Sequence, residues 1–415
     1  MQEQKRIIEN LFRYEYGKII AVLVNKFGPS HLESIEDAVQ DALLKAMQVW
    51  GYKDVPDNPT SWLFQVAKNG FIDKLRREKK FLIKEDFQND GKRSDPIEVP
   101  MENTISDSQL KMIFACCHPS LSLDYQIVLS LKLIGGFGNK EIANAMLKKE
   151  ETVAKSFTRA KKQLKTKITT MDIPLEMGLR SRMSIVLKVI YLMFSEGYAP
   201  SSGAFIIKKD ICLEAIRLAI LLSENKFCNL PNVHALIALM CFHAARFEAR
   251  VDEYLDLVDL ENQDRKKYNR DLIYIGIQHL EEASTEVQSP SSYHLEAAVS
   301  YYHCIAKSFK DTDWTSILRL YDLQLQRQHS PIVQLNRIVA YFKVHGAEKA
   351  IIELNKFKIA NNDVRNALFY ALQAELFFNL NDRKGAKETL KKAIYLTKNE
   401  LEKRHLKKKL NKLGV

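Results

Sequence analysis

The sequence predicts an all-α protein. Nearly every stretch repeats its apolar side chains at three- and four-residue steps, the period of a helix with one buried face. Alternating Val-rich runs are absent, and no pair of such runs is joined by an Asn-Gly or Asp-Gly turn. A length of 415 residues and an apolar fraction of 46% are enough for two or three packed domains.

Two helices are expected at the start of the chain, over residues 4–27 and 33–50, with a break at Gly28-Pro29-Ser30 between them. The second helix has one apolar face, formed by Ala38, Val39, Ala42, Leu43, Ala46 and either Val49 or Trp50. Its opposite face carries acidic and amide groups, with Glu36, Asp37, Gln40, Asp41 and Lys45. Such a face is either a solvated surface or a docking surface for a basic partner protein.

A third helix is expected over residues 59–80, because Asn58 can cap it and Pro59 fits the first helical position. Its apolar residues form one stripe, namely Leu63, Val66, Ala67, Gly70, Phe71 and Leu75. The residues off that stripe are polar and end in a basic group: Gln65, Lys68, Asn69, Asp73, Arg76 and Arg77. On its own, this basic end indicates either a surface helix that complements its macrodipole or a nucleic-acid contact.

Residues 81–106 lose the helical pattern and predict a linker after a first domain at 1–80. The segment mixes charges with the breakers Gly91, Pro96 and Pro100, and it has few apolar anchors. A flexible linker would let the modules on its two sides sit at separated positions on a long ligand.

The domain expected at 107–170 contains a helix-turn-helix. Two apolar helices over 109–117 and 124–133 precede a short helix over 139–146 and a longer one over 151–167. The buried faces of the last two helices would pack on each other. The short helix would contribute Ile142, Ala143 and Met146, and the longer helix would contribute Val153, Phe157, Ala160 and Leu164. The outer face of the longer helix would point toward base edges or phosphates. Its residues are Thr152, Lys155, Ser156, Arg159 and Lys162. A purely structural helical hairpin is the alternative.

The rest of the chain, 171–415, also predicts helix after helix. A shift of 36 residues aligns three sets of positions: Trp314, Ala350 and Ala386; Leu318, Leu354 and Leu390; Tyr321, Phe357 and Ala393. This spacing is close to that of helix-pair repeats of the tetratricopeptide type, which stack into a curved array with a concave binding surface. The basic tail, 398–412, is typical of a solvated terminal cap.

The formal charge of +11 favours an anionic partner, either nucleic acid or an acidic protein surface. No stretch approaches the roughly 18 apolar residues of a membrane span. The N-terminus carries Glu3, Glu9 and Glu15 where a secretory peptide has an apolar core, so a cytoplasmic protein is expected. The cysteines are scattered through apolar helical patterns, as reduced and buried thiols would be.

The sequence offers no catalytic or metal-binding arrangement. Residues able to bind a metal lie close together in the sequence only at Cys116-Cys117-His118, and adjacent residues cannot complete a tetrahedral site. We find no nucleophile with its base and no phosphate-cradling glycine loop. We therefore expect no enzyme activity, no cofactor and no metal.

The order of these features resembles that of bacterial sigma factors. It combines the acidic helix at 36–50, the run Pro59-Thr60-Ser61-Trp62-Leu63-Phe64-Gln65-Val66-Ala67-Lys68-Asn69 with Asp73-Lys74-Leu75-Arg76-Arg77, a polar linker and a helix-turn-helix. The resemblance covers about residues 7–168 and is to the extracytoplasmic-function (ECF) group, which keeps only the two conserved sigma regions.

A subgroup with a large tetratricopeptide-like C-terminal extension extends the resemblance over nearly the whole chain. The matching motifs are Phe114-Ala115-Cys116-Cys117-His118-Pro119, Tyr191-Leu192-Met193-Phe194-Ser195-Glu196-Gly197-Tyr198, Gln263-Asp264-Arg265, Tyr293-His294-Leu295-Glu296-Ala297-Ala298 and Leu335-Asn336-Arg337.

The resemblance implies a sigma factor that binds core RNA polymerase and directs promoter-specific transcription initiation. The helix at 36–50 would dock on the clamp helices of the β′ subunit through Asp37, Gln40 and Asp41. The helix at 59–80 would recognise the minus-ten element and hold the opened strand through Lys68, Asn69, Arg76 and Arg77. Trp62 would be a stacking surface or, as we favour, a core anchor. The helix-turn-helix would read the minus-thirty-five element in the major groove through Thr152, Lys155, Ser156, Arg159 and Lys162.

The recognition helix departs from the family pattern at one point. The family commonly has Thr-Val-Lys-Ser-Arg-Leu where this chain has Thr152-Val153-Ala154-Lys155-Ser156-Phe157. The basic face of the helix therefore comes from Lys155, Arg159 and Lys162 instead.

In this subgroup the extension is thought to influence sigma activity in place of a membrane-bound anti-sigma factor. The resemblance thus implies that residues 171–415 modulate activity, by sensing a ligand, binding a protein or bracing the polymerase. The polar residues in or near its family-like motifs would line a pocket or form buried ion pairs: Glu196, Arg246, Glu248, Arg250, Asp264, Arg265, Asn336 and Arg337. Two other functions stay open, a tetratricopeptide-type scaffold and a DNA-binding regulator that acts without polymerase.

Overall fold

The computed structural model is helical throughout the residues that it describes, as the sequence predicts. Among those residues, β-structure is limited to an isolated bridge between Val251 and Leu257. None of the helices described could cross a membrane, because none is both long and apolar enough. The residues described are 2–50, 55–82, 102–146, 148–168, 171–173, 176–199, 207–254, 256–285, 289–357, 365–397 and 399–413.

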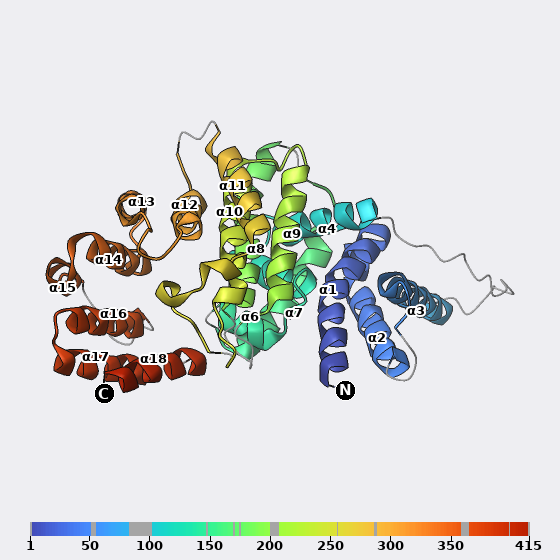
Figure 1. The fold of residues 1–415 in the computed structure, drawn as a ribbon. Coiled ribbons are helices and arrows are strands. Elements are labelled where there is room, and N and C mark those ends of the chain that lie inside the picture. The colour runs from blue at the N-terminus through green and yellow to red at the C-terminus, as the bar shows by residue number, and fades with distance from the viewer. Residues whose placement is uncertain are drawn as a thin grey trace. The chain divides into compact units, whose positions relative to one another are not determined.

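The chain divides into two compact units. Unit 1 consists of Met1–Glu196 and Leu213–Cys228, and unit 2 consists of Gly197–Cys212 and Asn229–Val415. Figure 1 labels the helices of both. Unit 1 therefore continues past residue 170 and takes in most of α8 (Glu176–Tyr198) and of α9 (Lys209–Glu224).

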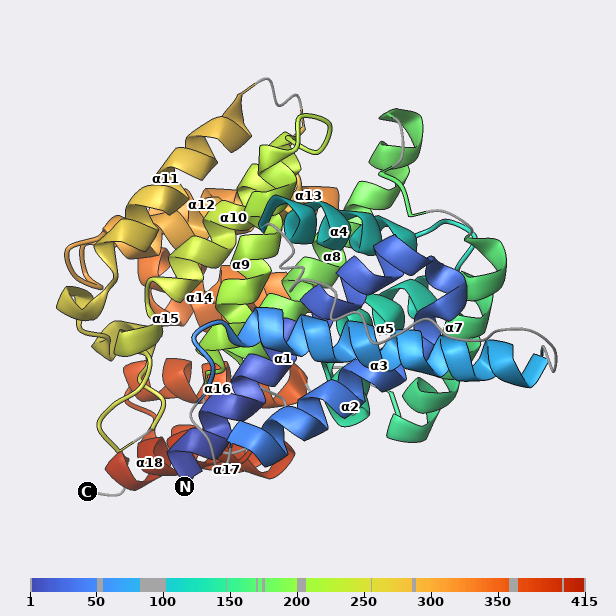
Figure 2. The same cartoon turned by 90° about the vertical axis from the view of Figure 1, so that its right-hand side faces the viewer.

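Unit 1 begins with three helices that pack on one another (Figure 2). Their bounds are Gln2–Phe27 for α1, Leu32–Trp50 for α2 and Pro59–Leu82 for α3. Gly28 has a φ of 92°, a conformation that favours glycine, and leads from α1 into the short 3-10 helix Pro29–His31. The break between the first two helices thus lies where the sequence predicts it.

The start of α3 is fixed by a cap and by an aromatic pair. The Oδ1 atom of Asn58 accepts a hydrogen bond from the Ser61 backbone N–H at 3.0 Å, so Asn58 caps the first turn as predicted. The rings of Trp50 and Trp62 lie 5.3 Å apart between centroids. Trp62 is therefore packed against α2, which agrees with its role as a core anchor.

The buried face of α3 is rotated from the predicted stripe. Its buried apolar residues are Leu63, Phe64, Ala67 and Phe71. The large rings of Phe64 and Phe71 occupy the inward face, so Gly70 moves to the exposed edge and Lys68 turns inward. Lys68 is only 7% exposed, and the prediction that it lies on the outer face is wrong.

Four further helices of unit 1 contain the predicted helix-turn-helix. They are α4 (Glu102–Cys116), α5 (Leu123–Leu133), α6 (Asn139–Ala145) and α7 (Glu150–Lys167). The buried residues of α7 are those that the sequence predicts, Val153, Phe157, Ala160 and Leu164. Ile142 and Ala143 of α6 are buried as well, which confirms the helix pair. Most of the predicted linker, 83–101, lies outside the described residues.

Helix α1 joins the two groups of helices in unit 1. It packs on α2 and α3 and also on α4 and α5, and every residue from Ile19 to Val24 is at most 6% exposed. The Asn25 side chain donates a hydrogen bond to the Ser108 hydroxyl on α4 at 3.1 Å. A Cβ atom at Gly17 would lie 2.3 Å from the carbonyl oxygen of Ile134, so only glycine fits this contact without a shift.

The parts of α8 and α9 that belong to unit 1 are attached to α4. The Arg182 Nη1 atom donates to the carbonyl oxygen of Phe114 at 3.2 Å. The Arg217 Nη2 atom donates to Gln109 Oε1 at 2.7 Å, and the Glu214 carboxylate binds the same guanidinium twice at 2.8 Å. Gln109 is 1% exposed and Glu214 is 9% exposed, so this contact is enclosed and its charges are paired.

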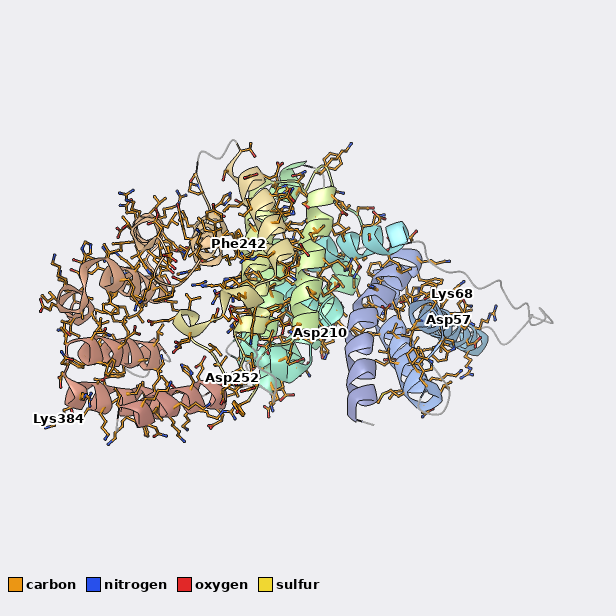
Figure 3. All side chains as sticks on the ribbon, in the orientation of Figure 1. Asp57, Lys68, Asp210, Phe242, Asp252 and Lys384 are labelled. Carbon is orange, nitrogen blue, oxygen red and sulfur yellow. The ribbon has the colours of Figure 1, made fainter. Side chains whose placement is uncertain are left out.

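Unit 2 is a succession of helices packed largely on their sequence neighbours. They are α10 (Pro231–Ala244), α11 (Arg270–Ser284), α12 (Ser292–Ile305), α13 (Trp314–Arg327), α14 (Pro331–His345), α15 (Ala347–Asn355), α16 (Arg365–Asn379), α17 (Arg383–Leu396) and α18 (Glu400–Lys412). Helix α10 is apolar nearly all round and packs on α11 and α12. Gly276 of α11 allows close approach, because a Cβ there would lie 2.7 Å from the ring of Phe242, which Figure 3 labels.

Eight of the nine positions aligned by the 36-residue shift lie on α13, α15 and α17, and Phe357 lies just after α15. Six of the nine are buried, and they are Leu318, Ala350, Leu354, Ala386, Leu390 and Ala393. The three partly exposed positions are Trp314, Tyr321 and Phe357. The shared spacing therefore corresponds mostly to inward-facing positions of alternate helices.

Helix α18 is the solvated terminal helix that the sequence predicts, since none of its residues is buried. Its basic residues also pair with two aspartates in the segment between α10 and α11. Arg404 lies 2.5 Å from Asp256, and His405 and Lys409 lie 2.9 and 2.8 Å from Asp259. No local sequence pattern indicates these ion pairs, because the partner carboxylates lie about 150 positions earlier in the chain.

The α18 contact predicts a pH-dependent difference in stability. Burial alone would raise the pKa of Asp259, but the hydrogen bonds and charges of His405 and Lys409 outweigh it and lower this pKa to about 2. The contribution is therefore present above the unfolded pKa of about 3.9 and is lost as the pH falls through about 2. Thermal unfolding should show Asp259→Asn less stable than the wild type at pH 6, with the difference gone near pH 2.

Glu261→Gln, which alters an exposed carboxylate nearby, is the control and should match the wild type throughout. Equal stability of Asp259→Asn and wild type at pH 6 would show that this pair does not hold α18.

Candidate nucleic-acid and protein interfaces

The exposed face of α2 combines acidic and apolar side chains. Asp37, Gln40 and Asp41 are exposed, as predicted. On the same face, one and two turns further along, Leu44 is 57% exposed and Met47 is 41% exposed. The sequence interpretation missed both, although helical spacing was the available signal: Leu44 follows Asp41 by three residues and Asp37 by seven, and Met47 follows Gln40 by seven. Exposed apolar groups beside carboxylates are typical of a protein-docking surface.

A groove runs between this face of α2 and the outer face of α3. Its lining residues are Asp37, Ala38, Gln40, Asp41, Gly70, Asp73, Lys74 and Arg77. Lys74 lies 2.7 Å from the Asp37 carboxylate and ties the two helices together across it. Nothing lies within 4 Å of a Cβ built on Gly70, so the glycine leaves this wall open. The structure thus brings the three docking candidates of α2 and Arg77 to one surface.

The basic end of α3 is exposed. Asn69, Arg76 and Arg77 are exposed, whereas Lys68 is buried. Arg76 lies 3.8 Å from Asp73, a long contact between two exposed groups that leaves the guanidinium available. Three of the four predicted minus-ten residues are therefore placed to meet a ligand.

The outer face of α7 is polar and basic. Thr152, Lys155, Arg159 and Lys162 are exposed, and Ser156 is half-buried. Their opposite face holds the helix against the rest of unit 1, as the period of the buried residues requires. A helix with this division of faces can enter a major groove while its other side stays packed.

Helices α2 and α7 are tied to each other by a buried ion pair. The Lys161 ammonium of α7 lies 2.7 Å from the Glu36 carboxylate of α2, and Glu36 is 5% exposed. The Tyr16 hydroxyl donates to the same carboxylate at 3.1 Å. Burial, and then the charge of Glu36, raises the pKa of Tyr16 far above its ordinary value, so this hydroxyl keeps its proton. Sequence patterns gave no sign of this pair, whose members are 125 positions apart.

The polar residues singled out in the C-terminal part have several different roles. Arg337 pairs with Asp322 at 2.5 Å and approaches Glu353 at 4.0 Å, which links α14 to α13 and α15. Asp264 caps the short 3-10 helix Arg265–Lys267. Glu248 pairs with Lys209. The described residues contain no group of three or more side chains that could hold a metal ion.

Comparison with known families gives three matches along the chain. Residues 11–81 match Sigma-70 region 2, residues 111–164 match Sigma-70 region 4, and residues 182–284 match a family of unknown function (DUF6596). The first match contains the candidate residues of α2 and α3, and the second contains those of α7.

Two relatives are similar to this chain. An uncharacterized protein of Rhizobium meliloti (strain 1021), R00370, is 30% identical over 391 residues, which span 93% of this chain and 91% of the relative. The RNA polymerase sigma factor YlaC of Bacillus subtilis (strain 168) is 26% identical over 165 residues, 39% of this chain and 92% of YlaC. No solved structure matches the chain.

The two sigma regions occur in the order that the sequence predicts, and each coincides with a helical group that exposes most of the expected polar residues, Lys68 being buried and Ser156 half-buried. The chain therefore belongs to the sigma-70 family: it is a sigma factor of the ECF type and not an enzyme, with regions 2 and 4 for core RNA polymerase and promoter DNA, followed by a helical domain.

Proposed function

We propose that α2 docks on the clamp helices of the β′ subunit of core RNA polymerase. The observation that carries this proposal is the exposed stripe of Asp37, Gln40, Asp41, Leu44 and Met47. The carboxylates would set the register against a basic partner, and the two apolar side chains would supply buried area. The ion pair of Asp37 with Lys74 makes Gln40 and Asp41 the stronger polar anchors.

The basic end of α3 would bind the minus-ten element. Arg76 and Arg77 would meet phosphates of the opened strand, and Asn69 would meet a base edge. Lys68 is left out of this set because its side chain is buried in unit 1.

The outer face of α7 would read the minus-thirty-five element. Thr152 and Ser156 lie toward the start of the helix, where recognition helices contact bases, and Lys155, Arg159 and Lys162 would contact phosphates. The C-terminal helices would then act as a tetratricopeptide-like array that modulates sigma activity.

Promoter binding would require α2 and α7 to separate. The names of the minus-ten and minus-thirty-five elements place them roughly 25 base pairs apart, which is about 85 Å of duplex. In the Lys161–Glu36 contact, by contrast, the ammonium nitrogen of region 4 lies only 2.7 Å from the carboxylate oxygen of region 2. The chain between Leu82 and Glu102 could reach about 65 Å if extended, so it is long enough for most of this separation. In this proposal, unit 1 as described would be the form of the factor before promoter binding.

Transcription in vitro tests the proposal. The full-length chain, mixed with core enzyme and a promoter library, should produce transcripts from templates that share one pair of elements. Failure to associate with core enzyme would instead favour a DNA-binding regulator or a scaffold.

The double variant Arg76→Ala/Arg77→Ala separates the two interfaces. Strand opening at a cognate promoter should fall by about tenfold or more, because two phosphate contacts are lost, while core association stays within about twofold. Permanganate reactivity of the opened strand measures strand opening, and a gel-shift titration measures association with core enzyme. Lys45→Ala, an exposed change on α2, should leave strand opening intact. Equal loss of both activities would contradict the assigned role.

A further inference from the structure

Unit 2 holds a cluster of buried and half-buried arginine and histidine side chains between the end of α10, the segment before α11 and the end of α12. Its members are His243, Arg246, Arg250, Arg265 and His303. Arg246 and His303 are each 9% exposed. Within the part of the chain that the structure describes, no carboxylate forms an ion pair with any of the three guanidinium groups. Buried charges in proteins normally have a partner of opposite sign.

Tyr268 connects two of the arginines. The Arg265 Nη1 atom donates to the Tyr268 hydroxyl at 2.8 Å and to the carbonyl oxygen of His303 at 2.6 Å. The Tyr268 hydroxyl donates to Gln263 Oε1 at 3.0 Å, and the Arg246 Nε atom donates to the same oxygen at 3.1 Å. Arg246 and Arg265 therefore lie on two sides of one short hydrogen-bonded chain.

Tyr198 holds the third arginine close to His243. The Arg250 guanidinium lies 3.7 Å above the Tyr198 ring and donates to the Tyr198 carbonyl oxygen at 2.9 Å. The same ring contacts the His243 imidazole edge-on, with 4.9 Å between centroids. The cluster is thus continuous from Arg250 through His243 to the Arg246 side.

Both imidazoles are uncharged. Burial, followed by the charges of Arg246 and Arg250, lowers the pKa of His243 to about 3. Burial, followed by the charges of Arg246 and Arg265, lowers the pKa of His303 to about 3. The excess charge therefore belongs to the three arginines, and neutral imidazoles can still offer one N–H each.

Two nitrogen atoms of the cluster have no hydrogen-bond partner among the described residues. They are Nη2 of Arg265 and Nδ1 of His303, and both are buried. Capping of helix ends explains the bonds of Arg250 and Arg265 to carbonyl oxygens at the ends of α8 and α12. It does not explain Arg246, which bonds to a side chain, or the two orphan nitrogens.

We propose that Arg246, Arg265 and His303 bind a phosphate group, either as the free ion or as part of a small molecule, with Arg250 adding charge. Guanidinium forks match the oxygens of a phosphate, and a dianion offsets more of the buried charge than a carboxylate does. This site is separate from the DNA-binding faces of unit 1 and does not depend on their assignment. Its three arginines lie in the part of the chain that matches the family of unknown function, and His303 lies beyond the end of that match.

Binding of inorganic phosphate to the full-length protein tests the proposal. Isothermal titration should give one saturable site per chain, and phosphate should raise the unfolding temperature above that in sodium chloride of equal ionic strength. Arg246→Gln and Arg265→Gln should each weaken binding by about tenfold or more. Arg270→Gln, an exposed arginine at the start of α11, should leave it unchanged.

Two further measurements keep the test decisive. The Arg76→Ala/Arg77→Ala variant should bind phosphate as well as the wild type, because its lesion lies in the DNA-binding face. If a glutamine variant fails to fold, Arg265→Lys retains the charge without the fork and should bind about tenfold more weakly. The proposal is overturned if the wild type shows no saturable phosphate binding, if acetate binds equally well, or if binding survives at Arg246→Gln and Arg265→Gln but disappears in the Arg76/Arg77 variant.

Discussion

Replacing Asp41 by arginine should weaken association with core RNA polymerase by about a hundredfold. The side chain is exposed on the docking face of α2 and, unlike Asp37, has no partner from α3 in an ion pair within the described part of unit 1. A reversed charge facing a basic partner costs several kcal/mol, because an attraction becomes a repulsion. Surface plasmon resonance with immobilised core enzyme measures the dissociation constant directly.

Asp57→Arg is the matched control, since it makes the same charge change at an exposed aspartate ahead of α3, labelled in Figure 3. It should leave the dissociation constant within about threefold of the wild type, as a peripheral charge does. Equal affinities for all three proteins would remove α2 as the docking helix.

Replacing Gly17 by alanine should destabilise unit 1 by about 1–3 kcal/mol. The added Cβ would meet the Ile134 carbonyl oxygen at 2.3 Å, and a backbone atom cannot move aside as a flexible side chain can. The contact between α1 and α5 would have to open. Chemical denaturation measures the loss, and hydrogen exchange should rise in α1 and around residues 130–134.

Gly70→Ala is the matched control, because it makes the same substitution in another helix of the same unit. Nothing lies within 4 Å of the new Cβ, so the only effect is on helix propensity, a gain of about 0.5–1 kcal/mol. The two variants should therefore move stability in opposite directions. A Gly17→Ala protein as stable as the wild type would mean that regions 2 and 4 are not packed together in solution.

The helical period of the apolar residues alone predicted the buried face of α7 correctly but misplaced the buried face of α3. In α7, the buried apolar side chains recur at three- and four-residue steps, so counting apolar residues was sufficient to find the buried face. In α3, the predicted stripe included Gly70 and left out Phe64, although the rings of Phe64 and Phe71 bury far more area than a glycine. The rotation they impose carries Lys68 inward.

Contacts between distant segments could not be predicted from the sequence. Glu36 and Lys161 each fit a solvated helix face when viewed locally, and only the packing of α2 against α7 makes them a buried pair. The same holds for Arg246 and Arg265, which lie 19 positions apart in the segment between α10 and α11 and meet at Tyr268. Periodicity tells which face of a helix is buried but not which partner covers it.

The attachment of Arg182 and Arg217 to α4 means that the helices following α7 provide part of the wall of region 4. If the chain were cut behind α7, Gln109, which is 1% exposed, would lose its arginine partner and face water. We expect mutations on the two sides of this wall to be inherited as compensating pairs. An extension of this kind would then be difficult to exchange between sigma factors, even where the promoter-reading helices are interchangeable.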